Sequence, residues 1–563
     1  MIMKNYLLSI LFIALNGSIY SQTLTWGKSF GGSGEDVLKS LHVDIDGNIY
    51  TTGFFNETAD FDMGENEFNL TSEGDLQDVF VQKVDTDGNF LWAKRFGSAG
   101  NDTGMSITTD LLGNVYIGGT YEGSVDFDPS SEEFILNSIG DLDIFVVKLN
   151  ANGDFLWAKS MGSEFYEDIV EIKMSDSGSL ILMGYFSENF DADPGVAEQI
   201  FNSQGSFDIF LIELNQSGEL IKAKSYGGNG FDLGMDMKIT SNGFILITGI
   251  FKGTIDLDPS ETEEYFLTST GGNNSGYTLV LDGDMNFLNA HSTNGGRVNF
   301  RAVSVTQDGS IYVTGDMQDA VNFGSVNGAD IILDSPFAPN AFVMKLDFNA
   351  NLQWVLKVNA EEPVFGLSVV ANADQVFISG FYENLTDFNP SETAEFNLEV
   401  ESLNATDAFL AIYSSNGEFV NAVNFGGVDF IDTHRMEIDI HGDLILGAHY
   451  GYNIDIDPSP ENVIEMTAVD WRDSYILKFG LENLGIGEEV LNTFSVYPNP
   501  TDDMVFIKGL NLYNTPYMIF DMLGREVKSG KVSNDQGISF PELSKGAYTL
   551  IIDKINKFKV IKN

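Results

Sequence analysis

A pair of carboxylates separated by one residue recurs along the chain and is the strongest candidate for chemistry. In a β-strand, residues i and i+2 point to the same side, so both carboxylates of a pair would share a face. Two hard oxygen ligands suit calcium, with backbone carbonyls completing the shell. The series comprises Asp60-Phe61-Asp62, Asp126-Phe127-Asp128, Asp191-Ala192-Asp193, Asp256-Leu257-Asp258, Asp387-Phe388-Asn389 and Asp455-Ile456-Asp457, whereas Asn322-Phe323-Gly324 breaks it.

The same pairs also have a structural interpretation, because most of them precede proline. Asp before Pro opens turns, and its side chain accepts hydrogen bonds from nearby backbone N–H groups. We therefore expect structural turns first, calcium as the alternative ligand, and direct contact with a partner third. No cofactor is assigned beyond that calcium alternative.

A second acidic series follows the glycines after each fourth strand. We expect these connections to share a face of the molecule with the carboxylate pairs, and we expect that face to meet a cation or a basic partner. The series is Asp36, Asp102, Asp168, Asp232 and Asp432.

Catalytic motifs are scarce, and we assign no catalytic residue. The chain has no cysteine, which excludes disulfides and thiol catalysis. Of five histidines, His434, His441 and His449 cluster late in the chain, but His441 occupies an ordinary hairpin turn. No nucleophile elbow, zinc-protease or phosphate-loop motif occurs. A glycosidase that uses two carboxylates stays open, since 83 acidic residues make chance pairs inevitable.

The elements that would carry these residues follow from a repeat of about 66 residues. Phe-Leu-Trp-Ala-Lys occurs at Phe90–Lys94 and again at Phe155–Lys159. A period this regular predicts a repeat architecture. We expect the repeated Trp to fill space between units rather than to bind sugar. The repeats start at Trp26, Trp92, Trp157, Lys222, Asn289, Trp354 and Asn421.

Each repeat predicts four antiparallel strands. Alternating or continuous β-branched and aromatic residues bounded by Asx-Gly turns indicate strands and hairpins. A lone strand, Thr23–Phe30, precedes the first repeat, and the last repeat has a third strand, Asp473–Phe479, but no fourth. Pairing those two would close a ring. The fold class is therefore all-β, a seven-bladed β-propeller whose N-terminal strand completes the last blade. In the second repeat the expected strands are Met105–Thr109, Asn114–Tyr121, Asp143–Asn150 and Asp154–Ser160.

These repeats resemble the bacterial β-propeller repeat family. The resemblance covers roughly residues 23–487 and implies the fold without naming a ligand. The fifth repeat departs from the pattern, with Asn289, Thr293 and Asn322 at positions expected to hold Trp, Phe and Asp. The repeats that carry the resemblance best include Trp26-Gly27-Lys28-Ser29-Phe30-Gly31-Gly32, Trp92-Ala93-Lys94-Arg95-Phe96-Gly97 and Trp157-Ala158-Lys159.

The two ends of the chain differ from the repeats. Residues 1–21 have the basic start, short apolar stretch and small final residue of a secretory signal peptide. We place the propeller at 22–484, an acidic linker at 485–490 and a small β-sandwich at 491–563. That last segment resembles a type IX secretion C-terminal sorting domain of type A. The matching motifs supply the expected sorting-signal residues Pro498, Asn499, Pro500, Thr501, Gly524, Gly546 and Tyr548.

Charge and export define the expected function. The net charge of -54 repels nucleic acid and anionic lipid, and we expect no transmembrane segment in the mature chain. The resemblance implies handling by the type IX translocon, and a product that is secreted or on the outer surface of a Gram-negative bacterium. We predict a non-enzymatic, adhesin-like binding module whose partners are glycans or surface proteins. The alternatives are an extracellular polysaccharide hydrolase or lyase, and an adhesin whose acidic surface serves only solubility.

Overall fold

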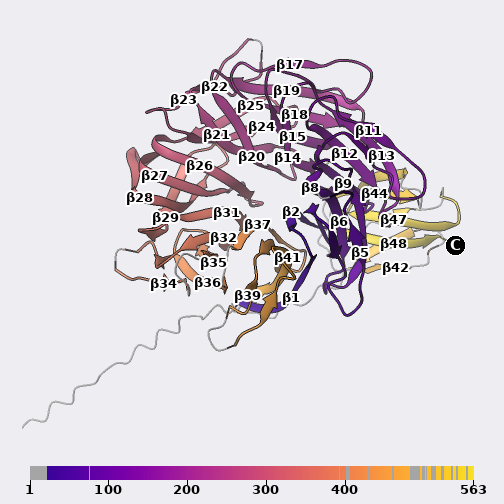
Figure 1. The fold of residues 1–563 in the computed structure, drawn as a ribbon. Helices are drawn as coiled ribbons and strands as arrows, with labels where there is room; N and C mark the ends of the chain where they lie inside the picture. Colours follow the sequence, from indigo (N-terminus) through magenta and orange to yellow (C-terminus); the bar gives the residue numbers. More distant parts are fainter. Residues whose placement is uncertain are drawn as a thin grey trace, which may run out of the picture.

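The computed structural model describes residues 22–481 and 495–562, except 75, 176, 261, 392, 401–405, 428–430, 459–461, 498–500, 502–503, 509–514, 522–524, 534–536, 540–542 and 553–555. Every regular element within these residues is a β-strand (Figure 1), which confirms the predicted all-β class. None of them forms a helix of the length and hydrophobicity that crossing a membrane requires. The expected signal peptide and the linker at 485–490 lie outside the described residues.

Antiparallel sheets of four main strands repeat along the chain. The first holds β2 (Asp36–Val43), β3 (Ile49–Phe55), β6 (Asp78–Val84) and β7 (Phe90–Phe96). The second holds β8 (Thr103–Thr109), β9 (Val115–Tyr121), β12 (Asp143–Leu149) and β13 (Phe155–Met161), each end within two residues of its prediction. The third holds β14 (Glu167–Met174), β15 (Leu180–Phe186), β18 (Asp208–Leu214) and β19 (Leu220–Gly228).

The later sheets follow the same order of strands. The fourth holds β20 (Phe231–Ile239), β21 (Ile245–Lys252), β24 (Ser275–Leu281) and β25 (Phe287–Ser292). The fifth holds β26 (Asn294–Val305), β27 (Ile311–Val326), β28 (Ala329–Leu346) and β29 (Leu352–Lys357). The sixth holds β31 (Val364–Ala371), β32 (Gln375–Glu383), β35 (Thr406–Ser414) and β36 (Phe419–Gly427).

The last sheet combines both ends of the repeat region. It holds β37 (Ile431–Ile438), β38 (Leu444–Tyr450) and β41 (Asp473–Leu481), and its fourth strand is β1 (Gln22–Gly32). Antiparallel pairing brings Lys28 opposite Ile476 and Phe30 opposite Ser474. This is the pairing that the sequence predicted. It gives the edge of β41 a partner and joins the first and last repeats.

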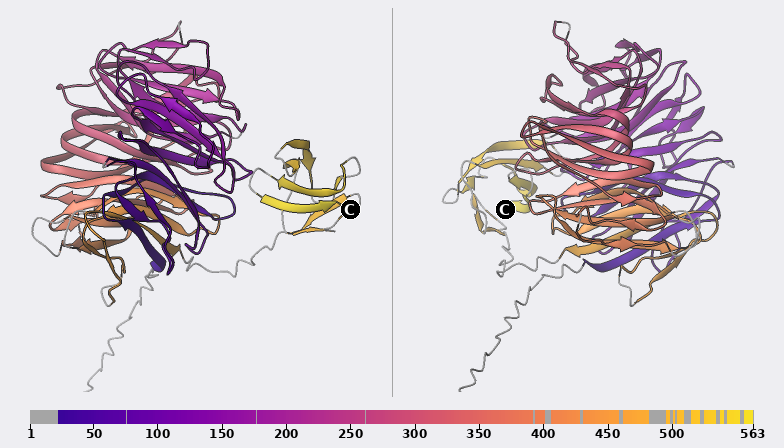
Figure 2. Two further views of the ribbon diagram at one scale, coloured as in Figure 1. Left: turned by 45° about the vertical axis from the view of Figure 1, so that its right-hand side comes forward. Right: turned by 90° about the vertical axis from the view of Figure 1, so that its left-hand side faces the viewer.

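The sheets stand around a common centre (Figures 1 and 2). Their first strands contact one another in a closed cycle, and hydrophobic clusters fill the space between neighbouring sheets. The second and third strands are buried on both faces, as their continuous apolar sequences require; β9 and β12 are buried at every residue. The cycle of first strands runs β2, β8, β14, β20, β26, β31, β37 and back to β2.

Each first strand carries a β-bulge at the same place, which increases its twist. A glycine of the second strand permits the close backbone approach beside it. A Cβ on Gly184 would lie 2.0 Å from the carbonyl oxygen of Asp168, so no larger residue fits there. The residue after the bulge lies on the inner side of the ring. In sequence order the bulges fall between Leu38 and Ser40, Gly104 and Ser106, Ile169 and Glu171, Gly234 and Asp236, Phe300 and Ala302, Gly366 and Ser368, and Thr433 and Arg435.

Short hairpins between the second and third strands were not predicted. Strands of two or three residues are too short to show an alternating pattern. In the fifth sheet the long strands β27 and β28 continue through this region instead, which accounts for its departure from the repeat. The short strands are β4 (Thr58–Asp60), β5 (Asn69–Thr71), β10 (Ser124–Asp126), β11 (Ile135–Asn137), β16 (Asn189–Asp191), β17 (Ile200–Asn202), β22 (Thr254–Asp256), β23 (Phe266–Thr268), β30 (Asn359–Ala360), β33 (Thr386–Asp387), β34 (Asn397–Leu398), β39 (Asn453–Asp455) and β40 (Glu465–Thr467).

The C-terminal segment forms two further sheets, shown in yellow in Figure 2. One core is shared between them, because Val505 and Ile538 of the first sheet cluster with Ile519 and Leu550 of the second. The first sheet holds β42 (Ser495–Tyr497), β43 (Met504–Lys508) and β46 (Ile538–Ser539). The second holds β44 (Thr515–Asp521), β45 (Glu526–Val532), β47 (Gly546–Ile552) and β48 (Asn556–Lys562).

Candidate functional site

The carboxylate pairs between the second and third strands form turns. Asp126 Oδ1 accepts hydrogen bonds from the backbone N–H groups of Asp128 (3.0 Å) and Phe134 (2.8 Å), and so joins the two ends of the β10–β11 loop. The middle residue, Phe127, is fully buried in the core. The same two acceptor bonds recur at Asp60, Asp191, Asp256, Asp387 and Asp455. Backbone groups therefore already occupy one oxygen of the first Asp in each pair, which supports the turn interpretation.

The second acidic series needs a correction at Asp168. Asp36 and Asp232 lie opposite Phe55 and Phe251, and the residue in the same register of β14 is Glu167, opposite Phe186. A shift of one residue reverses the face of a strand. Asp168 accordingly points the other way and accepts a hydrogen bond from the Tyr185 hydroxyl at 3.1 Å.

Asp432 shows the same one-residue shift. It pairs with His449, so Ile431 takes the position that Asp36 holds in the first sheet. The side chain of Asp432 lies outside the described residues.

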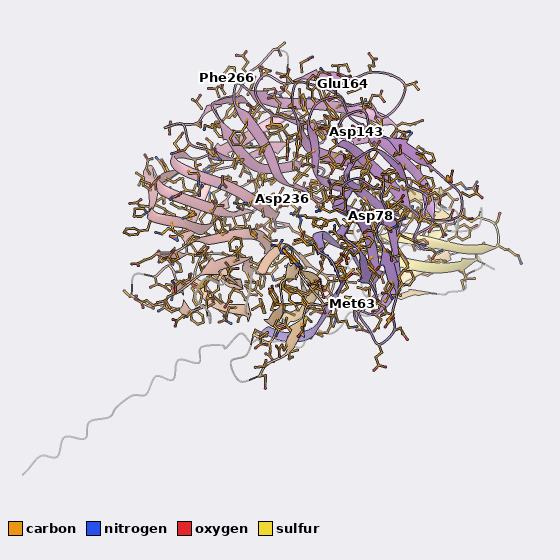
Figure 3. All side chains as sticks on the ribbon, in the orientation of Figure 1. Met63, Asp78, Asp143, Glu164, Asp236 and Phe266 are labelled. Atoms are coloured by element: carbon orange, nitrogen blue, oxygen red, sulfur yellow. The ribbon has the colours of Figure 1, made fainter. Side chains whose placement is uncertain are left out.

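Each first-strand acid in the register of Asp36 lies beside a second buried acid, which was not predicted from the sequence. This second acid is the first residue of the third strand in the preceding sheet, as with Asp78 and Asp143 (labelled in Figure 3). Its repetition about every 65 residues was the signal that could have found it. We call each such combination a junction pair: Asp473 with Asp36, Asp78 with Asp102, Asp143 with Glu167, and Asp208 with Asp232.

Burial makes the charged form of these carboxyl groups costly. It raises the pKa of Asp36 to about 8, and the neighbouring Asp473 adds to the rise. It also raises the pKa of Asp232 to about 8, with a further contribution from Asp208. Burial raises the pKa to about 6 for Asp78, Asp102, Asp208 and Asp473, and to about 7 for Glu167.

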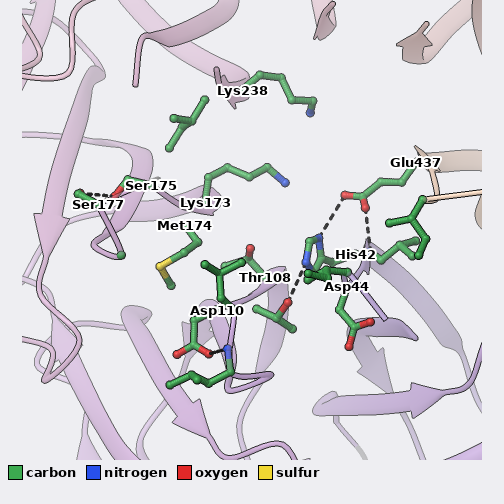
Figure 4. A pocket seen from close by; sticks show the side chains of 18 of the residues that line it. His42, Asp44, Thr108, Asp110, Lys173, Met174, Ser175, Ser177, Lys238 and Glu437 are labelled. Atoms are coloured by element: carbon green, nitrogen blue, oxygen red, sulfur yellow. Dashed lines mark hydrogen bonds and ion pairs between the residues drawn. The ribbon is translucent and has the colours of Figure 1, made fainter. Parts of the chain in front are cut away.

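A pocket of about 560 Å³ opens where several first strands end at the centre of the ring (Figure 4). His42 of β2, Lys173 of β14, Lys238 of β20 and Glu437 of β37 line it. The side chains of Lys173, Lys238 and Glu437 point toward one another across the pocket. Its apolar lining includes Ile45, Leu112, Met174, Ile440 and, from the C-terminal segment, Met518 and Phe520.

Below this pocket the inner wall of the ring carries a buried ionic network. Glu171 contacts the Lys173 ammonium at 2.8 Å and the Arg435 guanidinium at 3.2 Å, and it accepts a hydrogen bond from Ser106 at 2.9 Å. Burial alone would raise the pKa of Glu171, but the adjacent cations outweigh it and hold that pKa below its usual value. Asp236, near the centre of the ring in Figure 3, pairs with Lys238 at 2.9 Å.

The mouth of the pocket joins the first and last repeats. The backbone N–H of Val43 donates to Glu437 Oε2 at 2.8 Å. The His42 ring contacts Glu437 Oε1 at 3.5 Å and Thr109 Oγ1 at 3.0 Å. This site was not predicted from the sequence, because its residues come from several repeats and no motif links them.

The histidine side chains that the structure describes do not form a common site. His441 lies in the turn whose Asp439 carboxylate accepts its N–H, and the side chain of His434 lies outside the described residues. His291 and His449 are buried, and burial lowers the pKa of His291 to about 4 and that of His449 to about 3. Within the described part of the chain, no three or more His, Cys, Asp or Glu side chains are placed to hold a metal ion.

The described sorting residues have structural contacts. Thr501 is buried; its N–H donates to Ile561 O at 2.8 Å and its hydroxyl donates to Met504 O at 2.7 Å. The Tyr548 hydroxyl donates to Ser544 O at 2.7 Å. Gly546 is open, since a Cβ there would meet no atom within 4 Å. Pro498, Asn499, Pro500 and Gly524 lie outside the described residues.

Two protein families match parts of the chain. The secretion system C-terminal sorting domain family matches residues 495–563. The β-propeller repeat family matches residues 91–120, which include strands β8 and most of β9.

Curated relatives match only partially. An uncharacterized WD repeat-containing protein of Acanthamoeba polyphaga mimivirus is 28% identical over 120 residues, covering 19% of this chain and 9% of the relative. The regulatory protein FlaEY of Caulobacter vibrioides is 23% identical over 198 residues, covering 35% of this chain and 19% of the relative. The chain therefore spans less than a fifth of the length of either.

Solved structures overlap with more of the chain. Sqt1 from Chaetomium thermophilum covers 76% of this chain and 97% of its own, with 9% identity and a TM-score of 0.36. PorZ, a bacterial surface component of the type IX secretion system of Porphyromonas gingivalis, covers 95% and 100%, with 12% identity and a TM-score of 0.20. The chain thus contains a β-propeller repeat among its repeated four-stranded sheets and ends in a type IX secretion sorting domain.

Proposed function

We propose that the protein is an exported, adhesin-like binding module built as a closed seven-bladed β-propeller. A signal peptide at 1–21 would start export, and a small β-sandwich at 491–563 would present the sorting signal to the type IX translocon. The match of the sorting-domain family to residues 495–563 supports a secreted or cell-surface product. The outer surface of a Gram-negative bacterium is the corresponding location.

The pocket at the centre of the ring is the proposed binding site, and its lining is the observation that carries the proposal. Two ammonium groups, an imidazole and a carboxylate meet there beside apolar side chains from the turns. Concave sites that combine an apolar wall with a few convergent polar groups are typical of ligand pockets. An ionic or polyhydroxylated group, such as the end of a surface glycan, fits this chemistry.

The pocket offers less support for hydrolysis or lyase chemistry on polysaccharides. Its hairpin carboxylates are engaged locally: Asp44 Oδ1 accepts N–H groups from Asp46 and Asn48, and its Oδ2 accepts the Tyr50 hydroxyl. Asp110 repeats this arrangement in the next sheet. A general acid or base needs a carboxyl group free to reach the substrate.

A glycan array probed with the full chain tests the binding proposal. Lys238→Met removes one ammonium from the pocket, while Asp236 keeps hydrogen bonds from the N–H groups of Val303 and Met237. We expect at least about a tenfold loss of affinity for the captured glycan, the cost of one charge-assisted hydrogen bond. Lys224→Met, which removes a surface contact with Asn286, is the matched control. Equal binding by both variants would contradict the assignment of the pocket.

Export is tested separately by deleting residues 491–563. We expect the shortened chain to stay inside the cell envelope while the full chain reaches the surface or the medium. Equal export of both chains would contradict the role of the tail and leave the pocket assignment unaffected.

A further inference from the structure

The four junction pairs occupy equivalent places in the ring but differ in how their charge is compensated. At three of them, the N–H of the first-strand acid donates to the residue just before the third strand of the preceding sheet. The N–H of Asp36 donates to Arg472 O at 2.9 Å, and the N–H of Asp232 donates to Phe207 O at 2.9 Å. These bonds place each first-strand acid next to the acid that follows the acceptor residue. The two acids are therefore close enough for the charge of one to raise the pKa of the other: Asp473 does so for Asp36, and Asp208 for Asp232.

At two junctions, protein groups neutralise or satisfy the carboxylates. The Arg95 guanidinium contacts Asp78 Oδ2 at 2.5 Å and supplies a positive charge, although Asp78 Oδ1 accepts no hydrogen bond. At the next junction, Asp143 accepts N–H groups from Ile139 and Gly140. Its partner Glu167 accepts the N–H and the hydroxyl of Ser163. Every carboxylate oxygen of that second pair has a donor.

At the other two junctions no ion pair among the described residues reaches the carboxylates, and only some of their oxygens have donors: Asp36, Asp473 and Asp208 each accept one backbone N–H at Oδ2. Asp36 Oδ1 and Asp473 Oδ1 accept no hydrogen bond, although both residues are at most 3% exposed. Asp208 Oδ1 and Asp232 Oδ1 are in the same situation, at 2% and 0% exposure. The closeness of the first pair is visible at Gly31: a Cβ there would lie 2.5 Å from Asp473 Oδ1 and 2.9 Å from Asp36 Oδ2.

A buried carboxylate with an unpartnered oxygen and no cation beside it is costly, and a positive species that joins it lowers that cost. Arg95 shows which species this fold uses at one junction, and the equivalent residues at the uncompensated junctions are Ser29 and Ser225. Neither serine carries a charge. Calcium prefers hard oxygen ligands and binds carboxylates together with backbone carbonyls and water.

We propose that the Asp36–Asp473 and Asp208–Asp232 junction pairs each bind one calcium ion, which fastens the first strand of one sheet to the third strand of its neighbour. Each pair supplies two carboxylate ligands, and backbone carbonyls and water complete the shell. These sites differ from the turn-forming carboxylate pairs, whose first Asp already accepts two backbone N–H groups at Oδ1. The proposal does not depend on what the central pocket binds.

The most specific test introduces, at an uncompensated junction, the arginine that neutralises the Asp78 junction. Ser225 lies opposite Phe210 as Arg95 lies opposite Phe80, and Phe186 pairs with Asp208 as Phe55 pairs with Asp78. Ser225→Arg should therefore place a guanidinium against Asp208 in surroundings that already accept one at position 95. This variant keeps all four acids, so it does not rely on removing a buried group.

Calcium chloride is the probe, and equilibrium dialysis of the full chain counts the bound ions. We expect two ions per chain in the unaltered protein, one in Ser225→Arg, one in Asp36→Asn and two in Asp102→Asn, whose junction already holds Arg95. Circular dichroism verifies that each variant is folded, and Asp473→Asn replaces Asp36→Asn if that variant unfolds. Absence of bound calcium in the unaltered protein would overturn the proposal and leave a shared proton as the compensating species. An unchanged count in Ser225→Arg, or a lost ion in Asp102→Asn, would also overturn it.

Discussion

The indole Nε1 of Trp92 donates a hydrogen bond of 3.2 Å to the carbonyl oxygen of Ala151, which lies in the last hairpin turn of the next sheet. The Trp92 ring also packs edge-on against Tyr50 at a centroid distance of 6.4 Å. Each repeated Trp thus links a fourth strand to the neighbouring sheet instead of presenting a platform to solvent. The same bond joins Trp26 to Thr86, Trp157 to Gln216 and Trp354 to Ser415.

Replacing Trp92 with Phe should weaken this contact between neighbouring sheets. The smaller ring keeps part of the packing but leaves the Ala151 carbonyl without its donor, and we expect a loss of roughly 1–3 kcal/mol in unfolding free energy. Urea denaturation measures it. Leu91→Ala, at a neighbouring position that is 47% exposed, should change stability much less. A larger loss of stability for Leu91→Ala than for Trp92→Phe would contradict the proposed role of Trp92 in joining the two sheets.

Asp126 provides the test of the turn interpretation. Asp126→Ala removes the acceptor of two backbone N–H groups and should lower stability by about 1–3 kcal/mol. Asp126→Asn keeps an oxygen acceptor and should cost much less. Thermal unfolding of both variants distinguishes the turn from a calcium site. Asn keeps the oxygen that the turn needs but lacks the negative charge that a calcium ligand supplies. If Asn proves as damaging as Ala, the turn interpretation is wrong.

His291 should make stability depend on pH. Burial lowers its pKa from 6.5 to about 4, so the folded state resists protonation that the unfolded state accepts. Its contribution is fully present above pH 6.5 and is lost as pH falls from 6.5 to about 4, by on the order of 3 kcal/mol. Buried acids with raised pKa values change the pH dependence of stability in the opposite direction. The unaltered protein must therefore be compared with His291→Gln, which isolates the contribution of His291. Urea unfolding at several pH values should show a shallower acid dependence in the variant; parallel curves would contradict this.

Glu171 should be essential to the inner wall of the ring. Glu171 is buried, and Glu171→Gln leaves the half-buried cations Lys173 and Arg435 without their shared carboxylate, which should cost about 3–5 kcal/mol. Asp284→Asn removes a surface ion pair with Lys222, in which Asp284 is 87% exposed, and should cost less than about 1 kcal/mol. Chemical denaturation compares the two. Similar losses would show that the network contributes no more than a surface pair.

The sequence predicted the four main strands of each sheet because each of these strands carries its own pattern. The apolar run at Val115–Tyr121 and the Gly turn before it are local features, and the pairing of β1 with β41 followed from one missing and one surplus strand. The all-β class and the type IX tail were likewise confirmed. The boundaries of the expected domains stay predictions.

The sites were harder to predict from the sequence because they depend on contacts between different repeats. Asp168 and Glu167 are adjacent acids, and only the bulge and the register of β14 decide which one faces the junction. The pocket brings His42 and Glu437 together from opposite ends of the repeat region. No spacing within one repeat encodes either relation.

The pairing of β1 with β41 has a consequence for the order in which the chain folds. Every other sheet can form from one continuous stretch, whereas Lys28 and Ile476 are roughly 450 residues apart when they meet. Contacts at such separation carry the largest loop-closure entropy and form slowly unless earlier structure brings the ends together. The intermediate sheets supply that structure, so the final pairing is fast only once they have stacked. Ring closure should therefore be the last step of folding, and a chain stalled before it would expose the edges of β1 and β41 to association with other chains.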